Sequence, residues 1–202
     1  MIAKGRTIFH AMVDDKSASL HLLLSVVPKQ IEAMKKEVED EANSVSEEYK
    51  EWDEDAKKEI VRTWHPTVDT AIFDDMLCDF YASMIQRVYS YAEICILELC
   101  KDKESAEKER SAYMDNPEKE KVSNLTFYYR MIQRENGITL PALKRIWTSY
   151  REFHDIRNEI THEELTKRLS LDFLEKNIEE VCNFLISTEQ AILANNKKSQ
   201  AL

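Results

Sequence analysis

The stretch VDTAIFDDMLCDFYASMIQRVYSYAEICILELCK, residues 68–101, decides the fold of this chain. Its apolar residues fall on nearly every side of a helix, and neither glycine nor proline interrupts it. A helix that is apolar almost all round belongs inside a protein, surrounded by other elements. The stretch therefore predicts a central, buried helix of about 30 residues.

The composition predicts that the partners of this helix are helices too. Only two glycines and four prolines occur among the 202 residues. The turns of a β-sheet need residues with positive φ, a role that glycine fills most readily. So few glycines indicate long helices with few connections, and hydrophobic residues, at 43%, are numerous enough for a core. We expect an all-α fold, a helical bundle with an N-terminal helical extension.

Upstream of the central helix, the sequence predicts a helical arm. Residues 6–25 carry an apolar stripe, and Pro28 indicates a kink or a fresh helix start. Residues 29–64 are rich in Glu and Lys, which suits a long solvent-facing helix or hairpin with i,i+4 ion pairs. We interpret residues 1–65 as an N-terminal arm, either a docking arm or a solvated helical face, and residues 67–195 as the compact bundle.

Downstream, polar residues divide the chain into a loop and three helices. Residues 102–121 have almost no apolar content and are the longest predicted loop. The last residues, 195–202, are expected to fray. The three helices between them are predicted from their boundary signals: 123–136, with a Ser or Asn N-cap and Gly137 as the stop; 139–160, with Thr139 as N-cap; and 170–194, with Ser170 as N-cap.

The charge and the cysteines limit the class of protein. A formal net charge of −10 opposes a broad basic surface that coats nucleic acid, although it permits a small basic site inside an acidic shell. No run reaches 18 apolar residues and no secretory signal is apparent, so we expect no membrane span. The four cysteines form no CxxC pair and lie in apolar runs, which predicts buried free thiols in a cytoplasmic protein.

The sequence RNEITH, residues 157–162, holds the side chains best suited to chemistry. Arg157 lies at the edge of the apolar face of its predicted helix, where a guanidinium needs an anionic or acceptor partner. A straight helix would place His162 roughly 140° from Arg157. Thr161 and Glu164, however, form a T-x-x-E capping box, which marks a helix start. A break there would bring His162 back beside Arg157.

An arginine and a histidine side by side suit RNA cleavage without a metal ion. Arg157 can clamp the scissile phosphate through two hydrogen bonds and stabilise the charge that develops in the transition state. His162 can take the proton from a 2′-hydroxyl or give one to the leaving oxygen. Asn158 can orient the histidine or contact the phosphate. This chemistry requires no cofactor.

RNEITH resembles the R-x4-6-H motif of the HEPN superfamily, including the asparagine that commonly follows the arginine. Over about residues 67–195 the surroundings are similar: a long apolar helix, a polar loop, the motif, and one closing helix. The resemblance implies a homodimer in which Arg157 and His162 of two protomers meet, supported by Asn158, and cut RNA to leave 2′,3′-cyclic phosphate ends. It also implies a toxin–antitoxin or phage-defence role, with an antitoxin or another protein as partner.

The same residues admit a second function, that of a non-catalytic helical interaction module. Arg157 would then pair with a carboxylate such as Glu93, which is otherwise an edge residue that faces solvent. Whether His154 or Glu93 joins the catalytic site stays open. A metal site of His154, Asp155 and His162 is disfavoured, because HExxH is absent and no carboxylate cluster has the spacing of metal ligands. Five aromatic residues could stack bases, although core packing explains them better: Phe127, Tyr128, Tyr129, Trp147 and Tyr150.

Overall fold

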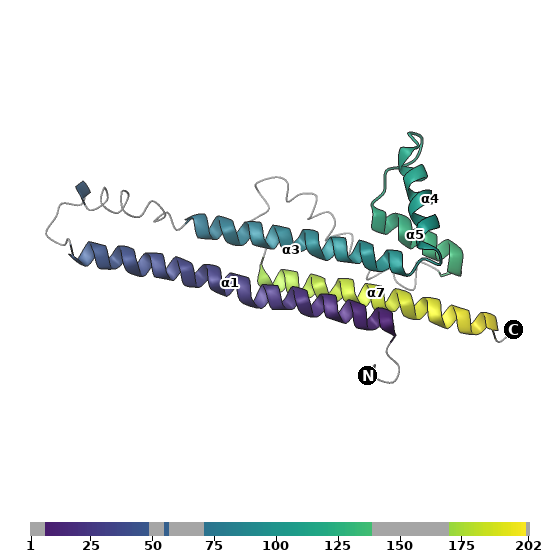
Figure 1. Cartoon of the computed structure of the whole chain (residues 1–202), viewed down its shortest axis with the longest axis horizontal. Helices are drawn as coiled ribbons and strands as arrows, with labels where there is room; N and C mark the ends of the chain where they lie inside the picture. The colour runs from purple at the N-terminus through teal and green to yellow at the C-terminus, as the bar shows by residue number, and fades with distance from the viewer. Residues whose placement is uncertain (1–6, 49–54, 57–70, 139–169, 201–202) are drawn as a thin grey trace.

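The computed structural model describes residues 7–48, 55–56, 71–138 and 170–200. Every secondary-structure element in these ranges is a helix, which confirms the prediction of an all-α fold. Figure 1 shows three long helices side by side, with two short helices at one end of them. The helices are α1 (Ile8–Glu48), α3 (Ala71–Glu98), α4 (Lys103–Asp115), α5 (Asn124–Asn136) and α7 (Leu171–Gln200).

The core follows the seam between the three long helices. Helix α1 runs antiparallel to α3 and α7, and each of the three contacts both others (Figure 1). The buried residues of each helix recur at helical spacing, so one stripe per helix faces the seam. They are Val13, Leu20 and Leu24 on α1; Met84, Ile85, Val88, Ala92 and Ile96 on α3; and Leu174, Ile178, Val181, Phe184 and Leu185 on α7.

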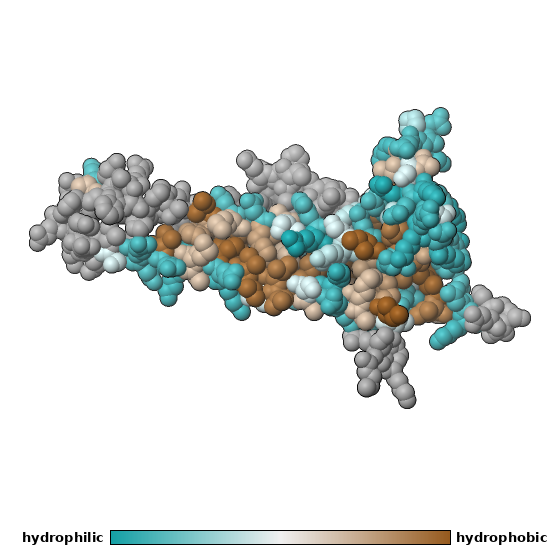
Figure 2. All heavy atoms as spheres, in the orientation of Figure 1, coloured by the Kyte–Doolittle hydropathy of each residue, from teal (hydrophilic) through white to brown (hydrophobic). Residues whose placement is uncertain are grey.

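Helix α3 is the central helix that the opening stretch predicts, and it contacts each of the other four labelled helices. Its burial is less complete than predicted, because Ile72, Met76 and Ile94 are 48%, 40% and 54% exposed. Helix α7 begins only part of the way along α3 (Figure 1), so the first turns of α3 lie beside α1 alone among the described helices. Figure 2 shows apolar side chains at the surface along this part of the bundle.

Helix α1 is one of the three helices that form the core. It contributes three side chains to the seam, and its Lys35 forms an ion pair with Asp74 of α3 at 2.9 Å. The residues that were predicted to form an arm therefore include a helix that the bundle itself requires. The boundary between the predicted parts 1–65 and 67–195 lies outside the described residues and stays a prediction.

Of the two alternatives predicted at Pro28, a kink or a fresh helix start, the fresh start does not occur, because α1 continues through this residue. A proline inside a helix costs about 3 kcal/mol, since it has no N–H for the carbonyl four residues earlier. Leu20 and Leu24 before the proline and Ile31 after it are all buried. Each buried apolar side chain stabilises the fold by about 1.5–3 kcal/mol, so packing on both sides of Pro28 outweighs its cost.

The prediction of a loop over residues 102–121 is wrong, because helix α4 occupies most of it. Asp102 caps this helix, and its carboxylate accepts a hydrogen bond from the N–H of Ser105 at 3.1 Å. Ala106 is buried and Tyr113 is half-buried two turns later, so the apolar stripe of α4 is narrow. A helix with so few apolar residues shows little hydrophobic periodicity in its sequence. Its stability comes mostly from packing on a partner.

The boundary signals predicted for α5 and α7 are confirmed. The hydroxyl of Ser123 accepts a hydrogen bond from the N–H three residues later at 3.2 Å, and Ser170 does the same at the start of α7, also at 3.2 Å. Gly137 ends α5 in the left-handed conformation with φ 64°.

The C-terminal segment is more ordered than its composition predicts. Helix α7 continues to Gln200, so the fraying expected from residue 195 is wrong for residues 195–200. The side-chain amide of Asn195 donates a hydrogen bond to the backbone carbonyl of Asn136 at the end of α5. This contact satisfies a carbonyl that the helix itself leaves without a partner, and it joins the two C-terminal ends.

We expect Gly137→Ala to lower the free energy of unfolding by about 1–2 kcal/mol, because an L-residue is strained in the left-handed conformation. Among the described residues, a Cβ at this position would meet only Nδ2 of Asn195, at 3.9 Å, which is an ordinary van der Waals contact and adds no steric cost. Urea unfolding followed by circular dichroism measures the change. Gly137→Asn is the matched control and should lose less, because asparagine tolerates this conformation. Equal stability of the alanine variant and the wild type would contradict the prediction.

Candidate functional site

The predicted catalytic residues Arg157, Asn158 and His162 lie outside the described residues, as do His154 and the capping box that begins at Thr161. Their mutual distances, and the break on which the convergence of arginine and histidine depends, stay predictions. The structure describes the elements on either side of this segment of the chain. Helix α5 ends before it and α7 begins after it, and both helices pack on α3.

Glu93 has a described partner at the start of α5. Its carboxylate accepts a hydrogen bond from the side-chain amide of Asn124 at 3.3 Å, and both residues are half-buried. Asn124 is the first residue of α5, where the unpaired N–H groups of a helix favour a negative charge. Glu93 is therefore not simply an edge residue that faces solvent, and it helps to fix α5 against α3. An ion pair between Glu93 and Arg157 stays a prediction.

The thiols are poorly suited to nucleophilic chemistry. Cys95 and Cys100 are buried, as predicted, whereas Cys78 and Cys182 are half-buried. Burial raises the pKa of Cys95 to about 11 and that of Cys100 to about 12, and it also raises the pKa of Cys182. A thiol must lose its proton to act as a nucleophile or a metal ligand. Within the described ranges, no group of three or more His, Cys, Asp or Glu side chains is placed to hold a metal ion.

A pocket with a cavity volume of about 530 Å³ lies between α4 and α5, and we call it the α4–α5 pocket. Three of its lining residues are basic, and two aromatic residues and a methionine form part of its apolar wall. This site was not predicted from the sequence. Arg130 and Arg134 stand four residues apart on α5, on one side of the helix, which is the signal that could have indicated it. The six residues are Lys119, Arg130 and Arg134, with Tyr113, Phe127 and Met131.

The aromatic wall of the pocket joins α4 to α5. The rings of Tyr113 and Phe127 lie 5.2 Å apart between centroids, at an interplanar angle of 55°. Phe127 is only 8% exposed and packs edge-on against Tyr128, whereas Tyr113 is half-buried. Phe127, Tyr128 and Tyr129 are all buried, which confirms core packing for the described members of the predicted aromatic set. Trp147 and Tyr150 lie outside the described residues.

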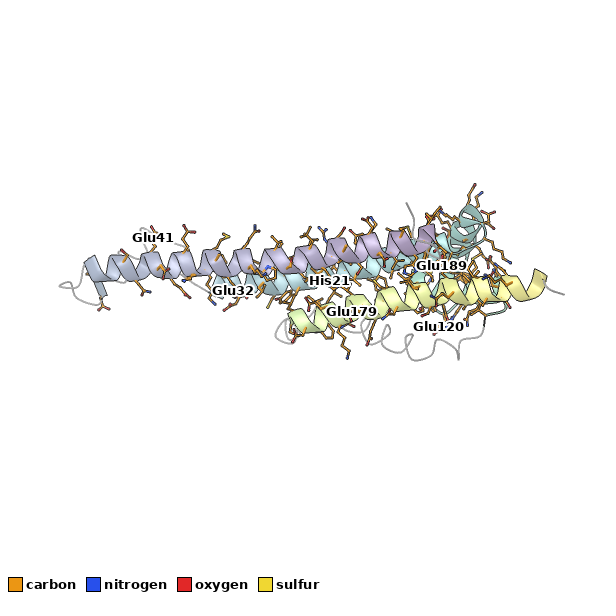
Figure 3. The ribbon with its side chains drawn as sticks, turned by 90° about the horizontal axis from the view of Figure 1, so that it is seen from below. His21, Glu32, Glu41, Glu120, Glu179 and Glu189 are labelled. Atoms are coloured by element: carbon orange, nitrogen blue, oxygen red, sulfur yellow. The ribbon has the colours of Figure 1, made fainter. Side chains whose placement is uncertain are left out.

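The charged rim of the pocket contains one ion pair with two short hydrogen bonds and one longer ionic contact. Arg134 donates two hydrogen bonds to the carboxylate of Glu109, at 2.8 and 2.9 Å, and these bonds hold the pKa of Glu109 below its usual value. Arg130 approaches the carboxylate of Glu120 only to 3.9 Å, and the Glu120 side chain is 77% exposed. Glu120 lies at the α4–α5 end of the molecule (Figure 3). Arg134 is thus held in place by its partner, while Arg130 is left largely available.

Comparison of the chain with protein-family models, with curated proteins and with solved structures finds no match. Within the described residues, no helix is both long and apolar enough to cross a bilayer. The chain has two candidate sites. One is the predicted Arg157–His162 site, and the other is the α4–α5 pocket, which the structure adds.

The ion pair between Glu109 and Arg134 should make stability depend on pH. Because the pKa of Glu109 is lowered in the folded state, the contribution of the pair is present above the ordinary pKa of a glutamate and is lost as the pH falls through the folded-state pKa. We expect Glu109→Gln to lower the free energy of unfolding at pH 7 by less than about 1 kcal/mol, since both side chains are partly exposed.

Urea unfolding of the wild type and the variant, compared at pH 7 and again near pH 3, measures this difference. The difference should shrink at the lower pH, where Glu109 itself becomes neutral. Glu120→Gln is the matched control on the same rim, and its effect should be negligible at both pH values. A stability difference for Glu109→Gln that persists unchanged in acid would contradict the electrostatic origin.

Proposed function

We propose that this chain is a metal-independent endoribonuclease of HEPN type. The observation that carries the proposal is the motif RNEITH, in which Arg157, Asn158 and His162 combine a phosphate clamp, a supporting amide and an acid/base group. The all-α architecture supports it, because a long central helix precedes the motif and a closing helix, α7, follows it in one bundle. The segment expected to be a polar loop contains helix α4, which is a departure from the expected pattern.

In the proposed reaction, His162 removes the proton from a 2′-hydroxyl of the RNA. The 2′ oxygen forms a bond to the adjacent phosphorus, and the bond from phosphorus to the 5′ oxygen breaks. A protonated His162 of the proposed homodimer gives a proton to the leaving 5′ oxygen, so the products are a 2′,3′-cyclic phosphate and a 5′-hydroxyl. Arg157 neutralises the phosphate oxygens, on which charge builds up in the transition state. Asn158 supports the histidine or the phosphate.

The partners that we propose follow from the same resemblance. A homodimer would bring the two motifs into one composite site, and an antitoxin or another protein would control it in a cytoplasmic toxin or defence system. The net charge of −10 disfavours indiscriminate binding of polyanions. We therefore expect a narrow RNA target, or a partner protein that delivers the RNA.

We expect purified protein to cut RNA in the presence of EDTA, and His162→Ala and Arg157→Ala to lower the rate at least about 100-fold each. The products should carry 2′,3′-cyclic phosphate ends. His21→Ala is the matched control, because it removes a histidine of α1, outside the segment that holds the motif. Its rate should stay close to that of the wild type. Gel analysis of a labelled RNA pool gives the rates.

Equal RNA decay in the wild type and all three variants would point to a contaminant, and no decay in any of them would remove the catalytic claim. The second outcome favours the alternative function, a non-catalytic helical interaction module. Analytical sedimentation of the wild type measures whether the protein is a dimer. The proposal of a dimer and the proposal of RNA cleavage are thereby tested separately.

A further inference from the structure

The α4–α5 pocket lies in a part of the chain whose charge differs from the rest. Residues 101–138 contain eight basic and eight acidic side chains, so the net charge of −10 resides entirely outside them. Of the charged side chains that line the pocket itself, three are basic and only Glu109 is acidic. Of the acidic side chains labelled in Figure 3, Glu32, Glu41 and Glu179 lie along α1 and α7, whereas Glu120 and Glu189 lie toward the α4–α5 end. The pocket is thus a local cationic site in an acidic protein.

The basic groups of the pocket differ in their availability. Arg134 is held by Glu109 through two hydrogen bonds, so its guanidinium is a fixed part of the wall. Arg130 has only a 3.9 Å contact with an exposed carboxylate, and no ion pair of Lys119 is seen among the described residues. Arg130 and Lys119 are therefore the groups that an anion entering the pocket would meet.

The other wall of the pocket suits a flat ring. Tyr113 is half-buried and is backed by Phe127 at 5.2 Å, so part of its ring surface faces the cavity while its position is fixed. Asn116 also lines the cavity, and its side-chain oxygen accepts a hydrogen bond from the N–H of Glu118 at 2.9 Å. That bond orients the amide group and leaves its NH₂ as a donor at the pocket.

We propose that the α4–α5 pocket binds a nucleotide, either free or as one residue of single-stranded RNA. The base stacks on Tyr113, and the phosphate lies between Arg130 and Lys119. A volume of about 530 Å³ is within the range of pockets that take small ligands. Aromatic stacking beside a basic rim is how proteins bind single strands without reading their sequence. The residues named here differ from those of the predicted Arg157–His162 site, and binding at the pocket does not depend on nuclease activity.

The two walls together favour a nucleotide over an acidic peptide. A peptide carboxylate would satisfy Arg130 and Lys119, but it would leave the aromatic and methionine wall exposed to water. A nucleotide covers both surfaces at once, because its base is flat and apolar on its faces and its phosphate is anionic. The difference between the two ligands is therefore their dependence on Tyr113.

Binding is measured by fluorescence anisotropy with the full-length protein and a labelled, short 2′-O-methyl oligonucleotide of mixed sequence. This probe has no 2′-hydroxyl nucleophile and stays intact, so failure of the nuclease proposal does not affect the result. Arg130→Glu should weaken binding about tenfold, as expected for loss of a charge-assisted contact. Tyr113→Ala should weaken it by a similar factor through loss of stacking, whereas Tyr113→Phe should retain binding.

Arg87→Glu is the matched charge control, because Arg87 is an exposed arginine on α3 that does not line the pocket. It should bind like the wild type, and circular dichroism checks that all four variants fold. Competition with unlabelled UMP identifies the source of the ligand. If UMP displaces the labelled oligonucleotide at concentrations similar to those of the unlabelled oligonucleotide, the ligand is a free nucleotide. If UMP displaces it only weakly, the ligand is an RNA strand. Either result supports the site if the variants behave as expected.

Three results would overturn the proposal. The first is the absence of any binding by the oligonucleotide and UMP. The second is unchanged binding in Arg130→Glu and Tyr113→Ala. The third comes from a labelled oligoglutamate peptide: if it binds as tightly as the oligonucleotide, and depends on Arg130 but not on Tyr113, the pocket recognises acidic peptides.

Discussion

The seam between α1, α3 and α7 is the packing interaction on which the remaining structure depends. Each of these helices has an apolar stripe, and the helix is stable only when the other two helices cover that stripe. Burial of one such side chain stabilises the fold by about 1.5–3 kcal/mol, whereas an exposed ion pair contributes about 0.2–1 kcal/mol. The many ionic side chains of α1 therefore affect solubility more than folding, and Leu20 and Leu24 fix where the helix lies.

The α4–α5 end is attached to this seam by the same kind of contact. Leu125, Tyr129 and Ile132 follow helical spacing on α5, and all three are fully buried. The ring of Tyr129 lies 5.3 Å from that of Phe184 on α7, and burial raises the pKa of Tyr129 to about 12. The inner face of α5 is thus as rigidly held as the core, and its outer face is free to form a site with α4. A pocket needs such a fixed wall to position its polar groups.

The sequence was informative where one residue determines the local geometry. Ser123, Gly137 and Ser170 could be placed in advance, because an N-cap or a left-handed C-terminal residue depends on the chemistry of that residue alone. Asp102 gave the same kind of signal for helix α4, but the narrow apolar stripe that follows it did not indicate a helix, because α4 packs on α5 through few apolar side chains. The same reason explains why α1 was expected to be an arm, although its stripe faces two helices far away in the chain.

The two candidate sites differ in how far the sequence defines them. The motif at residues 157–162 is contiguous, so its residue types could be recognised, and only the angle between Arg157 and His162 depends on a break in the helix. The α4–α5 pocket brings together Tyr113 and Arg130, which belong to different helices. No pattern along a single helix predicts such a pair, because it arises from the way that two polar helices pack.

The elongated shape of the bundle lets an acidic protein retain a local cationic site. Helix α1 has 41 residues and is therefore about 60 Å long, and its N-terminal end lies toward α4 and α5 (Figure 1). At physiological salt, charges are screened over about 8 Å, so carboxylates such as Glu41, far along α1, exert little force on an anion at the pocket. Their repulsion acts instead on RNA that approaches the side of the bundle. A strand would therefore meet the least repulsion at the α4–α5 end, where residues 101–138 carry no net charge and Arg130 and Lys119 attract the phosphates.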